Sequence, residues 1–174
     1  MKTAAISIAT ILLILATGCV PTKTGTHAGQ GTGGPAQTAS MGMPARDGKF
    51  EFTVTSLKRA QTAGDPTNPY SQAKAQGEFI IVGLTVRNIG DQAQTYFANN
   101  QKLVAAGKQY SASSEAAIYM PNSNMAEINP GLQVQPSVAF DVPVGTVPDD
   151  VDLHDSAFSG GVMVGLQGAS IPAS

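Results

Sequence analysis

The chain has 174 residues, with 10 Lys and Arg against 12 Asp and Glu, for a net charge of −2. It contains one Cys, so a disulfide within the chain and a cysteine-based metal site are both excluded. The basic residues are few and scattered, which excludes the basic stripe that binds nucleic-acid phosphates. We expect no nucleic-acid partner.

The N-terminus has the features of a secretion signal. Lys2 supplies a positive charge, a mostly apolar run extends from Ala4 to Leu15, and three small residues follow at 16–18. A membrane-spanning helix needs about 20 apolar residues. The shorter run with these flanks is typical of a signal peptide, which we predict over residues 1–18.

The segment Leu15-Ala16-Thr17-Gly18-Cys19 resembles the lipobox of bacterial lipoprotein precursors, although Ala16 stands where Leu is usual. The resemblance implies cleavage before Cys19 and a diacylglyceryl group on its sulfur, with no other cofactor. Two acyl chains give a stable membrane anchor, so we expect the chain to be held to the outer face of the cell membrane. The alternatives are an ordinary signal peptide with an incidental cysteine and an uncleaved anchor.

Residues 19–45 have the composition of a flexible tether. They are rich in Gly, Thr, Ala, Gln and Pro, and such a stretch buries too little apolar surface to offset chain entropy. A Gly-rich linker of this length spans on the order of 25–30 Å. We predict one domain over residues 46–167 and a frayed tail over residues 168–174.

Alternation of apolar and polar residues predicts β-strands within the domain. It runs through residues 50–55 and again through residues 80–87. Phe79 and Ile81 stand among the polar positions of the second strand, so we expect that strand to be partly covered on its outer face as well.

Turn signals separate further short strands. Ala106-Gly107-Lys108 predicts a hairpin, and Asn129-Pro130-Gly131 predicts another turn. Pro136 places the strand around it at an edge or a bulge, and residues 113–120 have helical potential over a short length only. Later strands are expected within residues 132–142, 151–153 and 162–166. Seven or eight short strands without a convincing amphipathic helix predict an all-β, immunoglobulin-like antiparallel β-sandwich.

The stretches "RDGKFEFTVTSL", "GEFIIVGLTVRNIGDQAQTYFANNQKLV", "YSASSEAAIY", "EINPGLQVQPSVAFDVPVG" and "LHDSAFSGGV" together resemble the DUF4352 domain of actinobacterial secreted proteins and lipoproteins. The resemblance covers residues 46–166. It implies a fold similar to that of the secreted mycobacterial antigen MPT63, and it implies no activity. Many relatives carry cysteines in the first two strands, at the positions of Arg59 and Ile80 here, so the resemblance implies one lost disulfide.

Few residues are available for catalysis. His154 is the one histidine of the domain, and Ser156 shares its face if both lie on a strand. No Gly-x-Ser-x-Gly turn accompanies them. We therefore expect no enzyme, and a small extracytoplasmic hydrolase is the weakest alternative.

Two other segments are candidate sites. Asp150, Asp152 and Asp155 offer the oxygen ligands that a hard cation prefers, although their spacing matches no EF-hand loop. The alternative is a solvated strand face whose charges protect an edge from aggregation. The following segment, residues 153–161, predicts a structural corner, with Phe158 filling the end of the core.

The other candidate is a recognition loop that carries Tyr119, Met120 and Met125. Methionine adapts to varied partners, and loops at the ends of sandwiches often carry recognition residues. The alternative is that these side chains pack against the core.

We expect a lipid-anchored, non-enzymatic binding module that meets an envelope protein or a cell-wall component. The alternative function is that of a phage- or prophage-associated envelope lipoprotein in superinfection exclusion.

Overall fold

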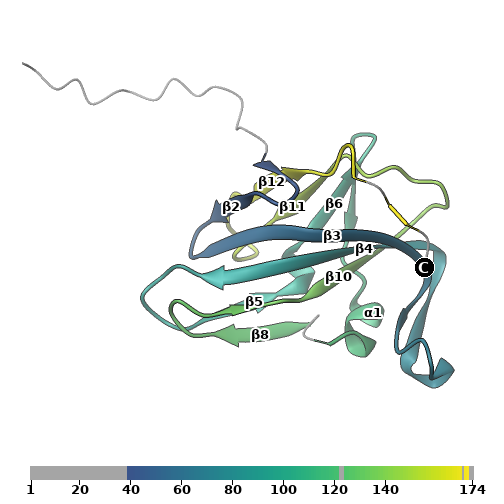
Figure 1. Ribbon diagram of the computed structural model, residues 1–174, viewed down its shortest axis with the longest axis horizontal. Coiled ribbons are helices and arrows are strands. Elements are labelled where there is room, and N and C mark those ends of the chain that lie inside the picture. The colour runs from purple at the N-terminus through teal and green to yellow at the C-terminus, as the bar shows by residue number, and fades with distance from the viewer. Residues whose placement is uncertain (1–38, 122–123, 170, 173–174) are drawn as a thin grey trace, which may run out of the picture. The chain divides into compact units, whose positions relative to one another are not determined.

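The computed structural model describes residues 39–121, 124–169 and 171–172, and Figure 1 shows their arrangement. The predicted signal peptide, Cys19 and most of the predicted tether lie outside these residues. Within the described ranges, no helix has the length and apolar character that a membrane crossing requires.

Twelve strands and three short helices make up the described part of the chain. The strands are β1 (Ala39–Ser40), β2 (Pro44–Asp47), β3 (Phe50–Gly64), β4 (Gln72–Asn88), β5 (Gln94–Phe97), β6 (Lys102–Ala105), β7 (Lys108–Ser111), β8 (Met125–Ile128), β9 (Gln133–Val134), β10 (Ser137–Val142), β11 (Asp150–Leu153) and β12 (Val162–Gly165). The helices are the 3-10 turns η1 (Pro69–Ser71) and η2 (Ala98–Asn100) and the α-helix α1 (Ser114–Tyr119). The number of strands exceeds the expected seven or eight because several have only two to four residues and little visible alternation.

The strands form two main sheets, which confirms the predicted antiparallel β-sandwich. One sheet has the order β1-β12-β11-β6-β7, and the other has the order β10-β4-β3-β2 with β9 added to β4. β5 and β8 pair as a separate two-stranded sheet. Every pairing is antiparallel except that of β1 with β12.

The main core lies between the two sheets. The predicted alternation holds, because Phe50, Phe52 and Val54 on β3 and Ile80 to Val86 at alternate positions on β4 are buried in one cluster. The other sheet contributes Leu103, Val151, Leu153 and Val164. The apolar face of each strand is thereby removed from water, which is the main driving force for this fold.

The outer face of β4 is covered as well, as Phe79 and Ile81 predicted. Both side chains are buried in a second cluster with Ala116 of α1 and Ala139 of β10. The helix predicted around residues 113–120 is therefore the element that covers this face. Its start is fixed by Ser113, whose side-chain oxygen accepts a hydrogen bond from the Ala116 N–H at 3.2 Å.

β3 and β4 have 15 and 17 residues, and their paired ends project beyond the sandwich. We call this projection, residues 61–74, the arm; it curves past α1 in Figure 1. Register shifts after Val54 and after Ala60 mark irregularities in β3, and such bulges bend a strand and increase its twist. The arm therefore bends away from the sandwich.

The ordered domain begins earlier than its composition predicted. Residues 39–45 fall within the predicted tether, yet they form β1 and the start of β2. Ala39 pairs with Val164, and Met41 packs against the main core. These contacts lie far apart in sequence, so the local composition of the segment does not reveal them.

Three residues of the tail predicted to be frayed make contacts with the rest of the domain. Ala169 and Ile171 pack against the main core, and the Pro172 carbonyl accepts a hydrogen bond from the Arg59 N–H at 3.0 Å. Two apolar residues in a mostly polar tail thus lie against the core. Gly168 is exposed, and residues 170 and 173–174 lie outside the described ranges.

The turn predictions hold. Ala106 and Gly107 connect β6 to β7 and both have positive φ, at 48° and 72°, which is the geometry of a two-residue type I′ hairpin. Pro136 separates β9 from β10, and β10 lies at the edge of its sheet. Proline has no N–H to donate, so the interruption falls where a strand needs fewest hydrogen bonds.

Arg59 and Ile80, the positions to which the resemblance assigns a lost disulfide, are directly paired between β3 and β4. In this chain Arg59 instead forms an ion pair with Glu78, and its guanidinium donates to the Thr146 carbonyl at 2.6 Å. Glu78 is 7% exposed. One of the two positions to which the resemblance assigns a disulfide is therefore part of a largely buried ion pair, and the other, Ile80, is buried in the main core.

Candidate functional site

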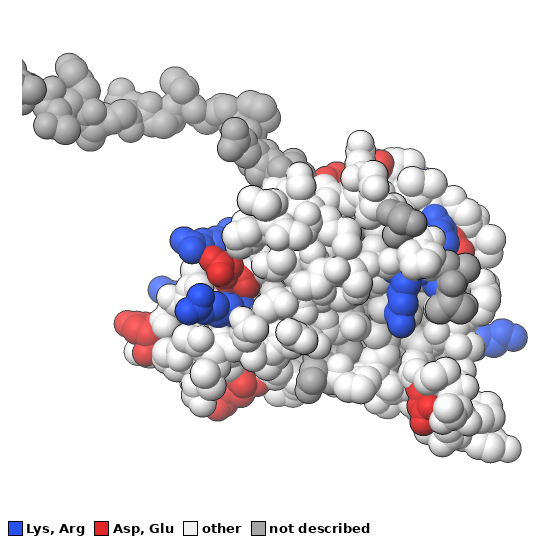
Figure 2. All heavy atoms as spheres, viewed as in Figure 1, with Lys and Arg blue, Asp and Glu red and all other residues white. Residues whose placement is uncertain are grey.

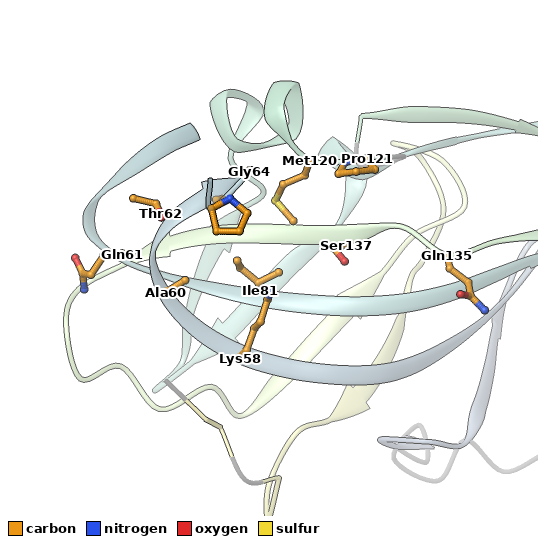
Figure 3. A pocket seen from close by; sticks show the side chains of 12 residues that line it. Lys58, Ala60, Gln61, Thr62, Gly64, Ile81, Met120, Pro121, Gln135 and Ser137 are labelled. Atoms are coloured by element: carbon orange, nitrogen blue, oxygen red, sulfur yellow. The ribbon is translucent and has the colours of Figure 1, made fainter. Parts of the chain in front are cut away.

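A groove of about 510 Å³ lies on the outer face of the β10-β4-β3 sheet, beside the arm. Ala60 and Ile81 form its floor, and Met120 and Pro121, which follow α1, form one wall. Figure 3 shows Met120 and Ile81 pointing toward each other across it. Ligand sites of small molecules commonly have volumes of about 300–1,000 Å³, so the groove has a suitable size.

Strand register brings the groove residues together from distant parts of the chain. Lys58 on β3 pairs with Ile81 on β4, which in turn pairs with Ala139 on β10. Ser137 enters the groove from the same strand as Ala139, two residues away and thus on the same face. The short helix α1 then sets the position of Met120 above this face.

The rim of the groove is polar and carries little charge. Gln61 and Gln135 lie at opposite ends of it in Figure 3, with Thr62 near the first. Among the described residues that line the groove, Lys58 is the single charged side chain and none is acidic. The groove thus combines an apolar floor with amide, hydroxyl and ammonium groups at its rim.

A second lysine, Lys74, lies on the opposite face of the arm. It pairs with Thr62 between β3 and β4, whereas its neighbours Ala73 and Ala75 are buried in the second cluster with Ile81, so the alternation of the strand points Lys74 away from the groove floor. Neither Lys58 nor Lys74 takes part in an ion pair within the described residues. On the face shown in Figure 2, basic and acidic side chains are interspersed and large areas are uncharged.

The structure separates the three residues of the predicted recognition loop. Met120 lines the groove. Tyr119 lies against the arm, where a Cβ added to Gly64 would be 2.9 Å from the Tyr119 Cβ. Met125 belongs to β8 instead, and residues 122–123 between them lie outside the described ranges.

Met125 forms a second apolar feature with Phe97. The two residues are paired between β5 and β8, and their exposed fractions are 57% and 43%. The opposite face of this two-stranded sheet buries Tyr96 and Ile128 in the main core. The outer face therefore presents two large apolar side chains next to each other.

The structure does not bring the three carboxylates of the acidic segment together. Asp152 lies 3.1 Å from the His154 Nε2, whereas Asp155 accepts a hydrogen bond from the Lys49 N–H at 2.9 Å. Partial burial and the neighbouring Asp149 carboxylate raise the pKa of Asp150. The described part of the chain contains no group of three such ligands positioned to hold a metal ion.

His154 contacts a carboxylate and a hydroxyl, but the hydroxyl is that of Ser159 and not that of Ser156. The Ser159 Oγ lies 3.4 Å from the His154 Nδ1 and donates to the Ser156 carbonyl at 3.0 Å. A Cβ added to Gly161 would lie 2.6 Å from the imidazole Cε1, so this turn packs closely on the ring. The groove contains none of these residues, and their mutual contacts brace the loop.

Phe158 does not fill the end of the core as the sequence predicted. Its side chain is 99% exposed on the same loop. The buried Gln101 side chain fixes the start of the loop. Its carbonyl oxygen accepts a hydrogen bond from the His154 N–H at 2.8 Å, and its amide nitrogen donates to the His154 carbonyl at 3.1 Å. The predicted corner is present, and it holds Phe158 outward.

Sequence reasoning missed most of the groove and the whole arm. Gln61, Thr62 and Gln135 carry no local pattern that marks a site, because the register of three strands assembles them. The tip of the arm does have a signal, the turn-forming residues 65–69, whose Asp65 carboxylate accepts hydrogen bonds from the Thr67 hydroxyl at 2.7 Å and from the Thr67 N–H at 2.9 Å. These hydrogen bonds lower the pKa of Asp65, and Tyr70 beside them is 91% exposed.

Solved structures with similar folds have low sequence identity to this chain. The secreted protein MPT63 of Mycobacterium tuberculosis is 20% identical, with a TM-score of 0.55 over 75% of this chain and 97% of its own. A β-sandwich protein of Clostridium difficile is 12% identical, with a TM-score of 0.50 over 78% of this chain and 98% of its own. These similarities support the fold.

A third structure is that of the lipoprotein-like ycdA of Bacillus subtilis, which is 12% identical. The TM-score is 0.51, and the alignment covers 72% of this chain but 39% of ycdA. No curated protein matches the chain. The family described as a domain of unknown function (DUF4352) matches residues 39–163. This match extends over most of the chain and includes every strand that lines the groove, so the chain belongs to the DUF4352 family.

Proposed function

We propose that this protein is a non-enzymatic binding module, held outside the cytoplasm by a diacylglyceryl group on Cys19, and that the groove is its binding surface. The groove carries the proposal, because it joins an apolar floor to polar rim groups on a face with no other evident role. Such a combination orients a ligand and contributes binding free energy.

The location is supported by the sequence and by the relatives. The lipobox-like segment ends in the chain's single cysteine, MPT63 is a secreted protein, and ycdA is lipoprotein-like. The absence of an enzymatic role is supported by the composition of the groove. Its described lining holds one lysine and no histidine, cysteine or carboxylate, so it lacks the paired acid and base that general catalysis requires.

The binding role is tested by photo-crosslinking in intact cells. A photoreactive amino acid placed at Gln61 on the groove rim is expected to yield a reproducible envelope adduct. The same group at Gln109, an exposed amide on β7 in the other sheet, is the matched control. Equal adduct patterns at the two positions, or no adduct at Gln61, would count against the groove as the binding surface.

The anchor is tested separately. The substitution Cys19→Ala is expected to abolish labelling by radioactive fatty acid and to release the domain or leave the precursor uncleaved. Labelling that survives the substitution would contradict lipidation. No observation on the structure or its relatives favours a role in superinfection exclusion.

A further inference from the structure

We propose that the groove binds an extended peptide that has small apolar side chains and a free carboxylate. This inference rests on the proposed binding function and adds the chemical class of the ligand. Charge, hydrogen-bonding capacity and floor shape each support it.

The charges favour an anionic group. Lys58 lines the groove, while the described lining contains no carboxylate. The whole chain is net negative, at −2. Lys58, which is outside any described ion pair, therefore gives the groove a local positive charge, and such a charge attracts an anion to this part of the surface.

The polar rim matches a peptide backbone. Gln61 and Gln135 lie at opposite ends of the groove, and each amide offers two donor hydrogens and an acceptor oxygen. A peptide also presents both N–H and C=O groups along its length. An extended segment lying from one glutamine to the other satisfies donors and acceptors on both sides.

The floor fits small or flexible apolar groups. Ala60 and Ala63 have short side chains, and Ile81 and Met120 provide a deeper apolar contact. Methionine adjusts its shape to the side chain that it meets. Ile81 is 4% exposed, so the floor is tightly packed and a ligand would lie on its surface.

Other classes of ligand fit less well. No aromatic side chain lines the described groove, so a sugar ring finds no flat apolar platform. A phosphate polymer is bound best by the forked guanidinium of arginine, and no arginine lines the groove. The polar rim in turn disfavours a bare acyl chain, because its amides would lose water without gaining partners.

The test compares two probes that differ in one group. The purified full chain in detergent is titrated with N-acetyl-trialanine bearing a free carboxylate and with the corresponding C-terminal amide, and binding is followed by NMR. We expect the acid to bind about two- to fivefold more tightly than the amide, which is the range for an exposed ion pair. The shifted resonances are expected to include those of Ile81 and Ser137.

Variants assign the difference to the groove. Lys58→Met is expected to remove the preference for the acid, so that acid and amide bind with similar affinities, and Lys58 is exposed, so the fold is retained. Lys108→Met, on exposed β7, is the matched control and is expected to keep the preference. Equal affinities for acid and amide in the unmodified chain, no binding of either probe, or tighter binding of poly(glycerol phosphate) would each overturn the proposal.

The outcome also separates this inference from the function on which it rests. A groove-specific adduct from Gln61 without binding of the acid probe would refute the peptide class and leave the binding module standing. Failure of both experiments would refute both.

Discussion

The hydroxyl group of Tyr96 lies in the main core, where it has no hydrogen-bond partner among the described residues. Burial alone raises its pKa far above the ordinary tyrosine value. The ring itself is well placed, since it makes an edge contact with Phe50 at a centroid distance of 6.5 Å. Packing and hydrogen bonding therefore oppose each other within this one side chain.

We predict that Tyr96→Phe raises the free energy of unfolding by about 1 kcal/mol, because an unpaired buried polar group costs about 1–3 kcal/mol and the ring is retained. Urea denaturation checks this value. Tyr110→Phe, at a half-buried position on β7, is the control and is expected to change little. A loss of stability in the Tyr96 variant would mean that its hydroxyl has a partner.

Ala106 is the one described non-glycine residue with positive φ. Asparagine tolerates this conformation better than alanine does. We predict that Ala106→Asn raises the free energy of unfolding by several tenths to about 1 kcal/mol and therefore raises the melting temperature. Ala106→Val is expected to lower both quantities. Thermal denaturation of the two variants separates the backbone effect from side-chain burial, because the site is exposed. A shift of the melting temperature in the same direction for both variants would contradict this prediction.

At the scale of elements, the pair of Arg59 and Glu78 joins β3 to β4 at the end of the sandwich. The Glu78 carboxylate also accepts a hydrogen bond from the Gly145 N–H at 2.8 Å, so it links three segments. We predict that Glu78→Gln lowers the free energy of unfolding by about 1–3 kcal/mol, because a buried charge-assisted hydrogen bond is lost and Arg59 remains.

A double variant tests the cause. Arg59→Met combined with Glu78→Met is expected to recover part of the lost stability, since it removes both charges and fills the same volume with apolar atoms. Chemical denaturation of the single and double variants gives the coupling. If the double variant is as unstable as the sum of the single changes, the pair is not the source of the effect.

The sequence predicted those elements whose residues alternate over a long stretch. Residues 50–55 and 80–87 were correctly assigned because one face of each strand lies in the core. β5 and β8 were missed, since each has four residues and offers too few alternations to be distinguished from loop. The outer parts of β3 and β4 were missed as well, because the arm consists of alanines and polar residues that show no clear apolar–polar alternation.

The candidate site was predictable only in part. Met120 stood out as a large apolar residue in a polar stretch, and it does line the groove. The sequence did not single out Lys58, Gln61 or Gln135 as site residues, because they come together only through the register of β3, β4 and β10. The prediction for Phe158 was wrong. A large aromatic residue is expected in the core, but the hydrogen bonds of its loop hold this side chain exposed to solvent.

At the scale of the whole molecule, β1 links the two sheets. The Met41 N–H donates to the Gly165 carbonyl at 3.1 Å, and the Gly42 N–H donates to the Val54 carbonyl at 2.9 Å, so the chain crosses from one sheet to the other within two residues. The domain boundary predicted at Arg46 cuts this link away.

We predict that a chain starting at Arg46 is less stable than one starting at Ala39 by about 2–4 kcal/mol, because it loses several backbone hydrogen bonds and the packing of Met41. Denaturant midpoints of the two truncated chains check this value. A chain starting at Pro44 retains β2 and is expected to share most of the loss, which distinguishes β1 from β2 as its cause. Equal midpoints for the Ala39 and Arg46 chains would show that β1 contributes nothing.

The position of β1 also determines how the domain responds to mechanical load. In a chain anchored at Cys19, any pull reaches the sandwich at Ala39 and acts first on the short pairing of β1 with β12. That pairing covers two residues, whereas the one between β3 and β4 runs along most of both strands. β1 therefore yields before the core does and lengthens the connection by roughly 15 Å. The domain gains slack under tension while the groove, on the β10-β4-β3 sheet, keeps its shape.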